Sequence, residues 1–297
     1  MKNPAVYRFS QFVGFLLGAR FFVTLLLTFA LYVSTFFLFN QEESLRNFVF
    51  DFRVHGIIFC TVLSILAGGI INQFYDREKD QLTKPFRTRV QAFIKQKYFL
   101  YGYLLLNFVS LGVAFLISER VFFFFLLYQF LMWFYSHKLS KLLILNNLTF
   151  VGLTLYPFFG MLVYYRTFSF KVFLMSVFIF LMLLIIDIIK DTLTKNADKV
   201  FGYATIPNHF GRKISTAILV FLLIFAMGIT AIIVARSGLH SIMSYYFGYS
   251  LFIQVFSVFL LMNPSKNSKF INLNVLRIWI LIGIFAMLAN GIYLKYY

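Results

Sequence analysis

The chain has 297 residues, of which 61% are hydrophobic, 21% aromatic and only 12% charged. This composition excludes a soluble globular protein of this size, because too few polar side chains exist to cover its surface. The net charge of +17 does not indicate a nucleic-acid-binding protein, since the basic residues lie in short segments between apolar runs rather than in one basic domain. The sequence therefore predicts an integral membrane protein without a nucleic-acid partner.

Long apolar runs follow one another along the chain, each close to the ~20 residues that a helix needs to cross a bilayer. We predict spans at residues 12–39, 54–73, 98–117, 121–136, 142–165, 170–189, 214–236, 240–262 and 275–296. The predicted fold class is therefore all-α, a multi-pass bundle of about nine transmembrane helices around a central cavity. The first run is too long for a signal peptide and is expected to be a retained helix. No polar linker divides the chain, so we expect a single domain over residues 1–297.

Acidic residues are scarce, ten in all, and six of them fall into two groups: Asp76, Glu78 and Asp80, and Asp187, Asp191 and Asp198. Such groups near the ends of membrane spans usually have a function or a partner. The first ligand set consists of Asn72, Asp76 and Asp80, and the second ligand set consists of Asp187, Asp191 and Asp198. Members of the first set are four residues apart, and members of the second set are four and seven residues apart. These spacings place each set on one helix face if the helix continues.

Carboxylate and amide oxygens of this kind are typical ligands of Mg²⁺, which takes one or two carboxylates together with phosphate oxygens. Basic residues adjoin both sets, at Lys84, Arg87 and Lys190, and can offset a polyanion. A diphosphate site with Mg²⁺ is therefore the favoured interpretation. The alternative is that the acids pair with neighbouring Lys and Arg side chains in an interfacial loop. Arg20, inside the first apolar run, either meets a phosphate or extends to the membrane interface.

Both ligand sets fall at the ends of even-numbered predicted spans, so both are expected on the same membrane face. The loops on that face carry most of the Lys and Arg residues. By the positive-inside rule this face is cytoplasmic, and we expect a cytoplasm-facing active site. Segment 70–76 (Ile-Ile-Asn-x-x-x-Asp) recurs as 185–191 (Ile-Ile-Asp-x-x-x-Asp), through either an ancient duplication or chance.

These motifs resemble those of the UbiA superfamily of intramembrane prenyltransferases. The resemblance covers Asn72-x-x-x-Asp76-x-x-x-Asp80 with Lys84-Pro85-Phe86-Arg87, then Tyr135-Ser136-His137-Lys138-Leu139 with Asn147, then Asp187-Ile-Ile-Lys190-Asp191 with Asp198 ahead of Gly202–Pro207. The matches occur in order over most of the chain, and nine spans is usual in the family.

Three positions depart from the family pattern. Thr194 stands where many members have an acid, Thr88 replaces a second Pro, and Asn146 stands where Gly often precedes Asn147. These departures bear on the number of metal ligands and on the acceptor pocket more than on the reaction class.

The resemblance implies an enzyme that transfers a prenyl group from a prenyl diphosphate with the help of Mg²⁺. It implies catalytic roles for Asp76, Asp80 and Asp191, metal binding by both ligand sets, and substrate binding by Lys84, Arg87, Tyr135, Ser136 and Lys190. The Ile-Ile-Lys-Asp string looks most like enzymes that prenylate geranylgeranylglyceryl phosphate. Two other functions remain open: an aromatic prenyltransferase of quinone biosynthesis acting on 4-hydroxybenzoate or dihydroxynaphthoate, and a non-enzymatic cation transporter. Membrane lipids are expected partners, and the sequence carries no signal for an oligomeric state.

Overall fold

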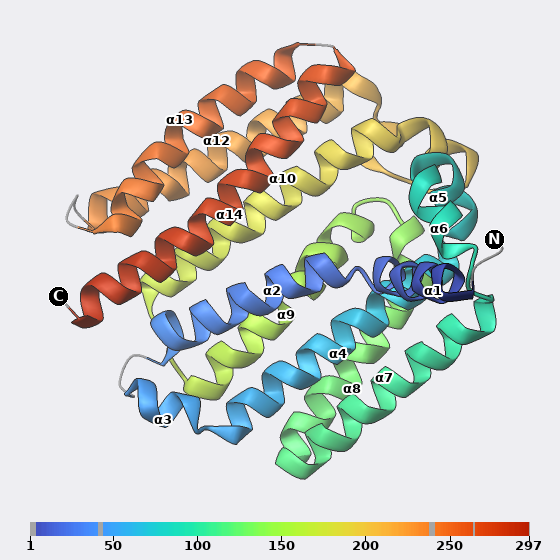
Figure 1. Cartoon of the computed structure of the whole chain (residues 1–297). Helices are drawn as coiled ribbons and strands as arrows, with labels where there is room; N and C mark the ends of the chain where they lie inside the picture. Colours follow the sequence, from blue (N-terminus) through green and yellow to red (C-terminus); the bar gives the residue numbers. More distant parts are fainter. Residues whose placement is uncertain (1–3, 41–43, 238–240, 264, 297) are drawn as a thin grey trace. The chain divides into compact units, whose positions relative to one another are not determined.

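The structure, a computed structural model, describes residues 4–40, 44–237, 241–263 and 265–296. These residues form helices and their connections, with no strand among them (Figure 1). The chain divides into two compact units. Unit 1 comprises Met1–Tyr32 and Glu42–Ser140, and unit 2 comprises Val33–Gln41 and Lys141–Tyr297.

Eight helices among the described residues are long and apolar enough to cross a membrane. They are α2 with the π-helical turn η1 (Phe21–Phe39), α4 (Phe52–Tyr75), α7 (Gln96–Ile117), α9 (Leu145–Tyr165), α10 (Phe170–Val200), α12 (Gly211–Ser237), α13 (Ile242–Met262) and α14 (Lys266–Tyr296). The predicted span at 121–136 corresponds to α8 (Glu119–His137), which is not among these eight. The all-α, multi-pass class is confirmed, and the helix count agrees with the prediction to within one.

The predicted continuous span over residues 12–39 is wrong, because the chain breaks between α1 (Pro4–Gly18) and α2 (Phe21–Ser34). Arg20 has a φ of 54°, in the left-handed region that cannot continue a right-handed helix. The break packs against Gly69 of α4, where a Cβ atom would lie 2.7 Å from the carbonyl oxygen of Ala19. This close approach joins distant segments, so local hydropathy does not reveal it.

Four of the longer helices begin at a residue whose side chain accepts a hydrogen bond from the first turn. Asp51 caps α4, Ser118 caps α8, Ser169 caps α10 and Ser241 caps α13. Such caps satisfy backbone N–H groups that have no partner inside the helix. They set where these helices start.

Polar side chains join the three long helices of unit 1, in which α4 packs against α7 and α8. The hydroxyls of Ser64 and Ser110 lie 3.1 Å apart, and the amide of Gln129 donates to Ser64 at 3.2 Å. The thiol of Cys60 donates to the carbonyl of Ser110 at 3.3 Å. Hydrogen bonds of this kind hold helices together in lipid, where the hydrophobic effect gives little drive for association. The helix α4 that carries Asn72 is thereby fixed.

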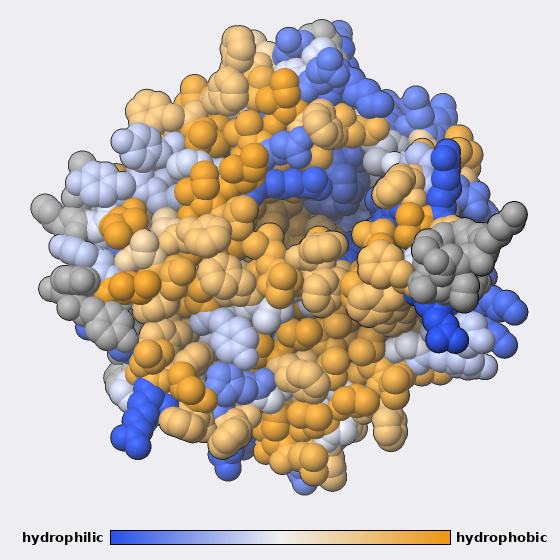
Figure 2. Space-filling view, in the orientation of Figure 1, coloured by the Kyte–Doolittle hydropathy of each residue, from blue (hydrophilic) through white to orange (hydrophobic). Residues whose placement is uncertain are grey.

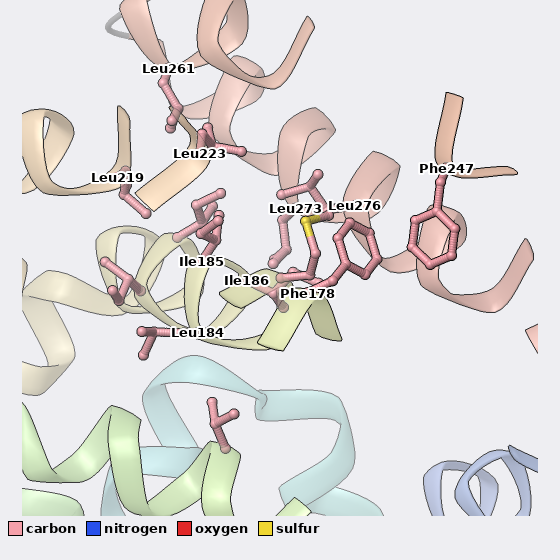
Figure 3. Packing of buried hydrophobic residues seen from close by; sticks show 14 of the residues in the cluster. Phe178, Leu184, Ile185, Ile186, Leu219, Leu223, Phe247, Leu261, Leu273 and Leu276 are labelled. Carbon is pink, nitrogen blue, oxygen red and sulfur yellow. The ribbon is translucent and has the colours of Figure 1, made fainter. Parts of the chain in front are cut away.

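Unit 2 is built around α10, which packs against α9, α12, α14 and the short helix α11 (Ile206–His209). Figure 3 shows Ile185 and Ile186 of α10 among leucines of α12 and α14. These side chains are buried and form one apolar cluster. The C-terminal half of α10, which carries the second ligand set, is thus held on a packed apolar face.

Apolar side chains, coloured orange, cover much of the surface in Figure 2. Phe22, Phe108 and Phe252 are each more than 70% exposed. Aromatic surface of this extent is not stable in water. It is the surface expected of helices that contact lipid.

We predict that Gly69→Ala lowers the free energy of unfolding in detergent by about 1–3 kcal/mol, because the new methyl group would meet the backbone of Ala19. Gly112→Ala on α7 is the matched control, since nothing lies within 4 Å of its Cβ position. It should be neutral or slightly stabilising. Equal losses in thermal denaturation of the two variants would contradict the proposed packing of the helix break.

Candidate metal and diphosphate site

The first ligand set spans the junction between α4 and α5 (Arg77–Thr83). Although α4 ends at Tyr75, the backbone N–H of Asp76 donates to Asn72 at 2.9 Å, and that of Asp80 donates to Asp76 at 2.8 Å. The helical spacing of four therefore continues through the junction. The amide of Asn72 donates to the Asp76 carboxylate at 2.7 Å, so these two side chains meet as predicted.

Cations surround the buried Asp80 carboxylate. The Lys84 ammonium donates to Asp80 Oδ1 at 2.7 Å. Partial burial lowers the pKa of Lys84; Asp80 opposes this effect, and the charges of Arg20 and Arg87 add to it. Arg87 also donates to the carbonyl of Gly18 at 3.4 Å, at the end of α1. The predicted phosphate-binding residues Lys84 and Arg87 are thus close to the first ligand set.

Arg20 joins this group of cations through the break between α1 and α2. Its Nε is buried and has no hydrogen-bond partner among the described residues. Its charge lies near enough to Lys84 and Arg87 to lower the pKa of both. Three neighbouring positive charges beside Asp76 and Asp80 leave a net positive charge, which favours binding of an anion.

The second ligand set is carried by α10, which runs without interruption to Val200. Asp187 and Asp191 are both buried. The amide nitrogen of Asn147, on α9, donates to both carboxylates, at 2.8 Å to Asp187 Oδ2 and 2.9 Å to Asp191 Oδ2. The structure therefore brings these two predicted ligands together.

The ammonium of Lys190 lies against the other oxygen of each carboxylate. It donates to Asp187 Oδ1 and lies 3.9 Å from Asp191 Oδ1. Its side chain remains 41% exposed, whereas those of Asp187 and Asp191 are 4% and 8% exposed. The pair of carboxylates is thus held between an amide on one side and a cation on the other.

Asp198 is fully buried and accepts a hydrogen bond from Thr194 at 2.7 Å. Many family members carry an acid where this chain has Thr194. Here the Thr194 hydroxyl instead orients the carboxylate of Asp198. Across the described part of the chain, no three His, Cys, Asp or Glu side chains gather as a metal-binding group. The metal-binding role of Asp198 therefore stays a prediction, and a metal ion at either set would need oxygen ligands beyond the carboxylates.

Asn146 and Asn147 follow a strained turn at Ile144, whose φ of 66° is rare for a β-branched residue. The turn is closed by a hydrogen bond from the Leu145 N–H to the Leu143 carbonyl at 2.7 Å, which makes it the uncommon γ-turn with positive φ. Strain of this kind persists where the surrounding structure enforces it. Here the turn starts α9 so that both Asn side chains reach the acids of α10.

Neither Asn146 nor Asn147 was among the predicted site residues, although Asn147 belongs to a motif that resembles the family's. Their amide oxygens are buried and accept no hydrogen bond from any described residue. An amide oxygen of this kind is unfavourable until it meets a donor or a cation. Together with the adjacent carboxylates, these oxygens are hard ligands that fit Mg²⁺.

Tyr135 and Ser136 lie near the end of α8. Ser136 is buried, and its hydroxyl donates to the carbonyl of Met132 at 3.1 Å. Only the lone pairs of this hydroxyl could therefore face a ligand. Substrate binding by Tyr135 and Ser136 stays a prediction.

The fold and the site define a multi-pass helical membrane protein with two sets of hard oxygen ligands, each beside basic side chains. The model of the UbiA prenyltransferase family matches residues 45–281, and the chain belongs to this family.

Two similar proteins from different organisms share one name. The chain is 33% identical over 156 residues to digeranylgeranylglyceryl phosphate synthase of Methanosphaera stadtmanae. This aligned segment covers 52% of this chain and 56% of that protein. It is 29% identical over 159 residues to the protein of the same name from Thermococcus gammatolerans, covering 53% of this chain and 57% of that protein. The matches thus span little more than half the length of these relatives.

Solved structures share the fold. A digeranylgeranylglyceryl phosphate synthase superposes with a TM-score of 0.72 at 18% identity, covering 95% of this chain and 99% of that chain. A UbiA homologue from Archaeoglobus fulgidus bound to GPP and Mg²⁺ gives a TM-score of 0.65 at 16% identity, covering 93% and 99%. At these identities the likeness establishes the fold alone.

We predict that Asn147→Ala lowers the free energy of unfolding by about 2 kcal/mol, because two buried carboxylates lose a shared donor. Asn146→Ala on the same helix is the matched control. It should cost less, since its single bond to Asp191 is long, at 3.4 Å. A smaller loss in Asn147→Ala than in Asn146→Ala, measured by thermal denaturation in detergent, would contradict this assignment.

Proposed function

We propose that this protein transfers a prenyl group from a prenyl diphosphate to a lipid-type acceptor, with Mg²⁺ held by the two ligand sets. The observation that carries the proposal is the buried Asp187–Asp191 pair, bridged by Asn147 and adjoined by Lys190. In a chain of the UbiA prenyltransferase family, such a pair of carboxylates is well suited to a metal that binds diphosphate.

The proposed acceptor is geranylgeranylglyceryl phosphate. Relatives named digeranylgeranylglyceryl phosphate synthase support this choice, because their product carries two geranylgeranyl chains on one glyceryl phosphate. The Ile-Ile-Lys-Asp string around Lys190 supports it as well. An aromatic acceptor is the competing proposal.

We further propose that residues 1–297 act as one domain and that both ligand sets face the cytoplasm. The parity of the spans and the excess of Lys and Arg in the adjoining loops support this topology. Lipids of the bilayer would surround the apolar helices.

The roles of the side chains follow from their chemistry. Asn72, Asp76 and Asp80 would hold one ion, and Asp187, Asp191 and Asp198 the other. Bound Mg²⁺ would supply a Lewis acid for the leaving diphosphate. Lys84, Arg87 and Lys190 would bind diphosphate oxygens, where negative charge accumulates as the allylic C–O bond breaks. Tyr135 and Ser136 would contact substrate nearby.

One experiment tests the reaction class and the acceptor together. Purified protein with Mg²⁺ and geranylgeranyl diphosphate is offered geranylgeranylglyceryl phosphate, 4-hydroxybenzoate or dihydroxynaphthoate, and the products are identified by mass. We expect release of diphosphate and a product with the glyceryl phosphate acceptor. If product forms only with a phenolic compound, the acceptor is aromatic rather than geranylgeranylglyceryl phosphate. Cation flux in liposomes without any product would favour a transporter.

We predict that Asp76→Asn and Asp191→Asn each lower kcat by about 10²-fold or more, since each removes charge that holds a metal at the leaving group. Glu78→Gln is the matched control, because Glu78 lies between Asp76 and Asp80 in sequence but is exposed. It should retain activity. Full turnover in either Asp variant, with all three proteins folded in detergent, would reject the site assignment.

A further inference from the structure

The ammonium of Lys190 is the cation shared by the carboxylates of Asp187 and Asp191. It contacts Asp187 Oδ1 and is 3.9 Å from Asp191 Oδ1. On the other side of the pair, the Asn147 amide nitrogen donates to both Oδ2 atoms. The Oδ1 atoms of both acids therefore face one position, and a positive charge already occupies it.

The two carboxylates are more deeply buried than the Lys190 side chain beside them. Asp187 and Asp191 have side chains less than 9% exposed and are tied to α9 through Asn147. The Lys190 side chain is 41% exposed. Its flexible four-carbon stem allows the ammonium to move without any change in the backbone.

A vacant position between these acids would be strongly unfavourable, because two buried carboxylates would face each other without compensation. The position therefore favours an occupying cation, because without one an acid of the pair would have to take up a proton. A divalent ion satisfies more oxygen ligands than an ammonium does, since Mg²⁺ binds six.

We propose that Lys190 and a divalent cation compete for this position, and that the arriving ion displaces the Lys190 ammonium toward the diphosphate. Lys190 is then an internal counter-ion in the metal-free protein and a phosphate ligand in the loaded protein. No covalent bond changes in this step. The inference rests on the proposed function for the diphosphate, but the exchange of cations can be measured without any turnover.

The experiment measures binding of Mn²⁺, a paramagnetic substitute for Mg²⁺, by electron paramagnetic resonance of the free ion. All proteins carry Asp76→Asn, so that the first ligand set contributes little. Without diphosphate, we expect Lys190→Met to bind Mn²⁺ about tenfold more tightly than the Lys190 protein, because the competing charge is gone. Equal or weaker binding by Lys190→Met would overturn the proposal.

Two control variants separate competition from general effects. Lys190→Arg keeps a positive charge and should bind Mn²⁺ about as weakly as the Lys190 protein. Lys199→Met removes an exposed charge from the same helix and should leave the affinity within about twofold, because solvent screens that charge. If Lys199→Met binds Mn²⁺ as much more tightly as Lys190→Met does, the change in net charge alone would explain the effect. That result would overturn the proposal.

A thermal measurement covers the case in which Lys190→Met is poorly stable. We expect this variant to melt at a lower temperature than the Lys190 protein without metal, and to gain more from added Mn²⁺, since a ligand that binds only the folded state raises its stability. If Mn²⁺ raises the melting temperature of Lys190→Met no more than that of the Lys190 protein, the result would contradict the exchange.

Inorganic pyrophosphate tests the second half of the proposal. It should increase the Mn²⁺ affinity of the Lys190 protein by about tenfold more than that of Lys190→Met, because only the former gains an ammonium–phosphate contact. An equal increase in both would overturn the transfer of Lys190 to phosphate. Retained turnover in Asp191→Asn would contradict the proposed function instead, so failures of the two proposals are distinguishable.

Discussion

The burial of like charges in an apolar helix bundle is the constraint on which the second ligand set depends. Asp187 and Asp191 lie one helical turn apart and are almost wholly shielded from solvent. Such a pair is stable only when donors and cations satisfy its oxygens. Asn147 and Lys190 meet this need from two sides, and the remaining structure of unit 2 keeps them there.

That support comes from apolar and polar contacts together. The face of α10 away from the acids packs among leucines of α12 and α14. Its acids meet α9, whose start is set by the strained turn at Ile144. In unit 1, serines, Gln129 and Cys60 connect α4 with α7 and α8. The polar atoms of both units therefore have two uses, to join helices and to present ligands.

Hydropathy was sufficient to predict the class of fold and most of the spans, because lipid imposes a long apolar run on each crossing helix. The spacing of Asn72 and Asp76 predicted their contact for an equally local reason. The break at Arg20 could not be predicted, since it depends on the missing side chain of Gly69 on another helix. The asparagine partners of Asp187 and Asp191 were missed for the same reason. Asn146 and Asn147 are distant in sequence, and nothing local marks an amide as the partner of an acid.

The backbone around the first ligand set limits how this segment can vary in length. Hydrogen bonds at intervals of four residues run from Asn72 through Asp76, Asp80 and Lys84 to Thr88, across the ends of three helices. Each added or deleted residue would rotate everything after it by about 100°. Insertions are usually tolerated in exposed segments between spans, but here one would turn Lys84 away from Asp80. Natural variants of this region are therefore expected to exchange side chains while keeping the number of residues constant.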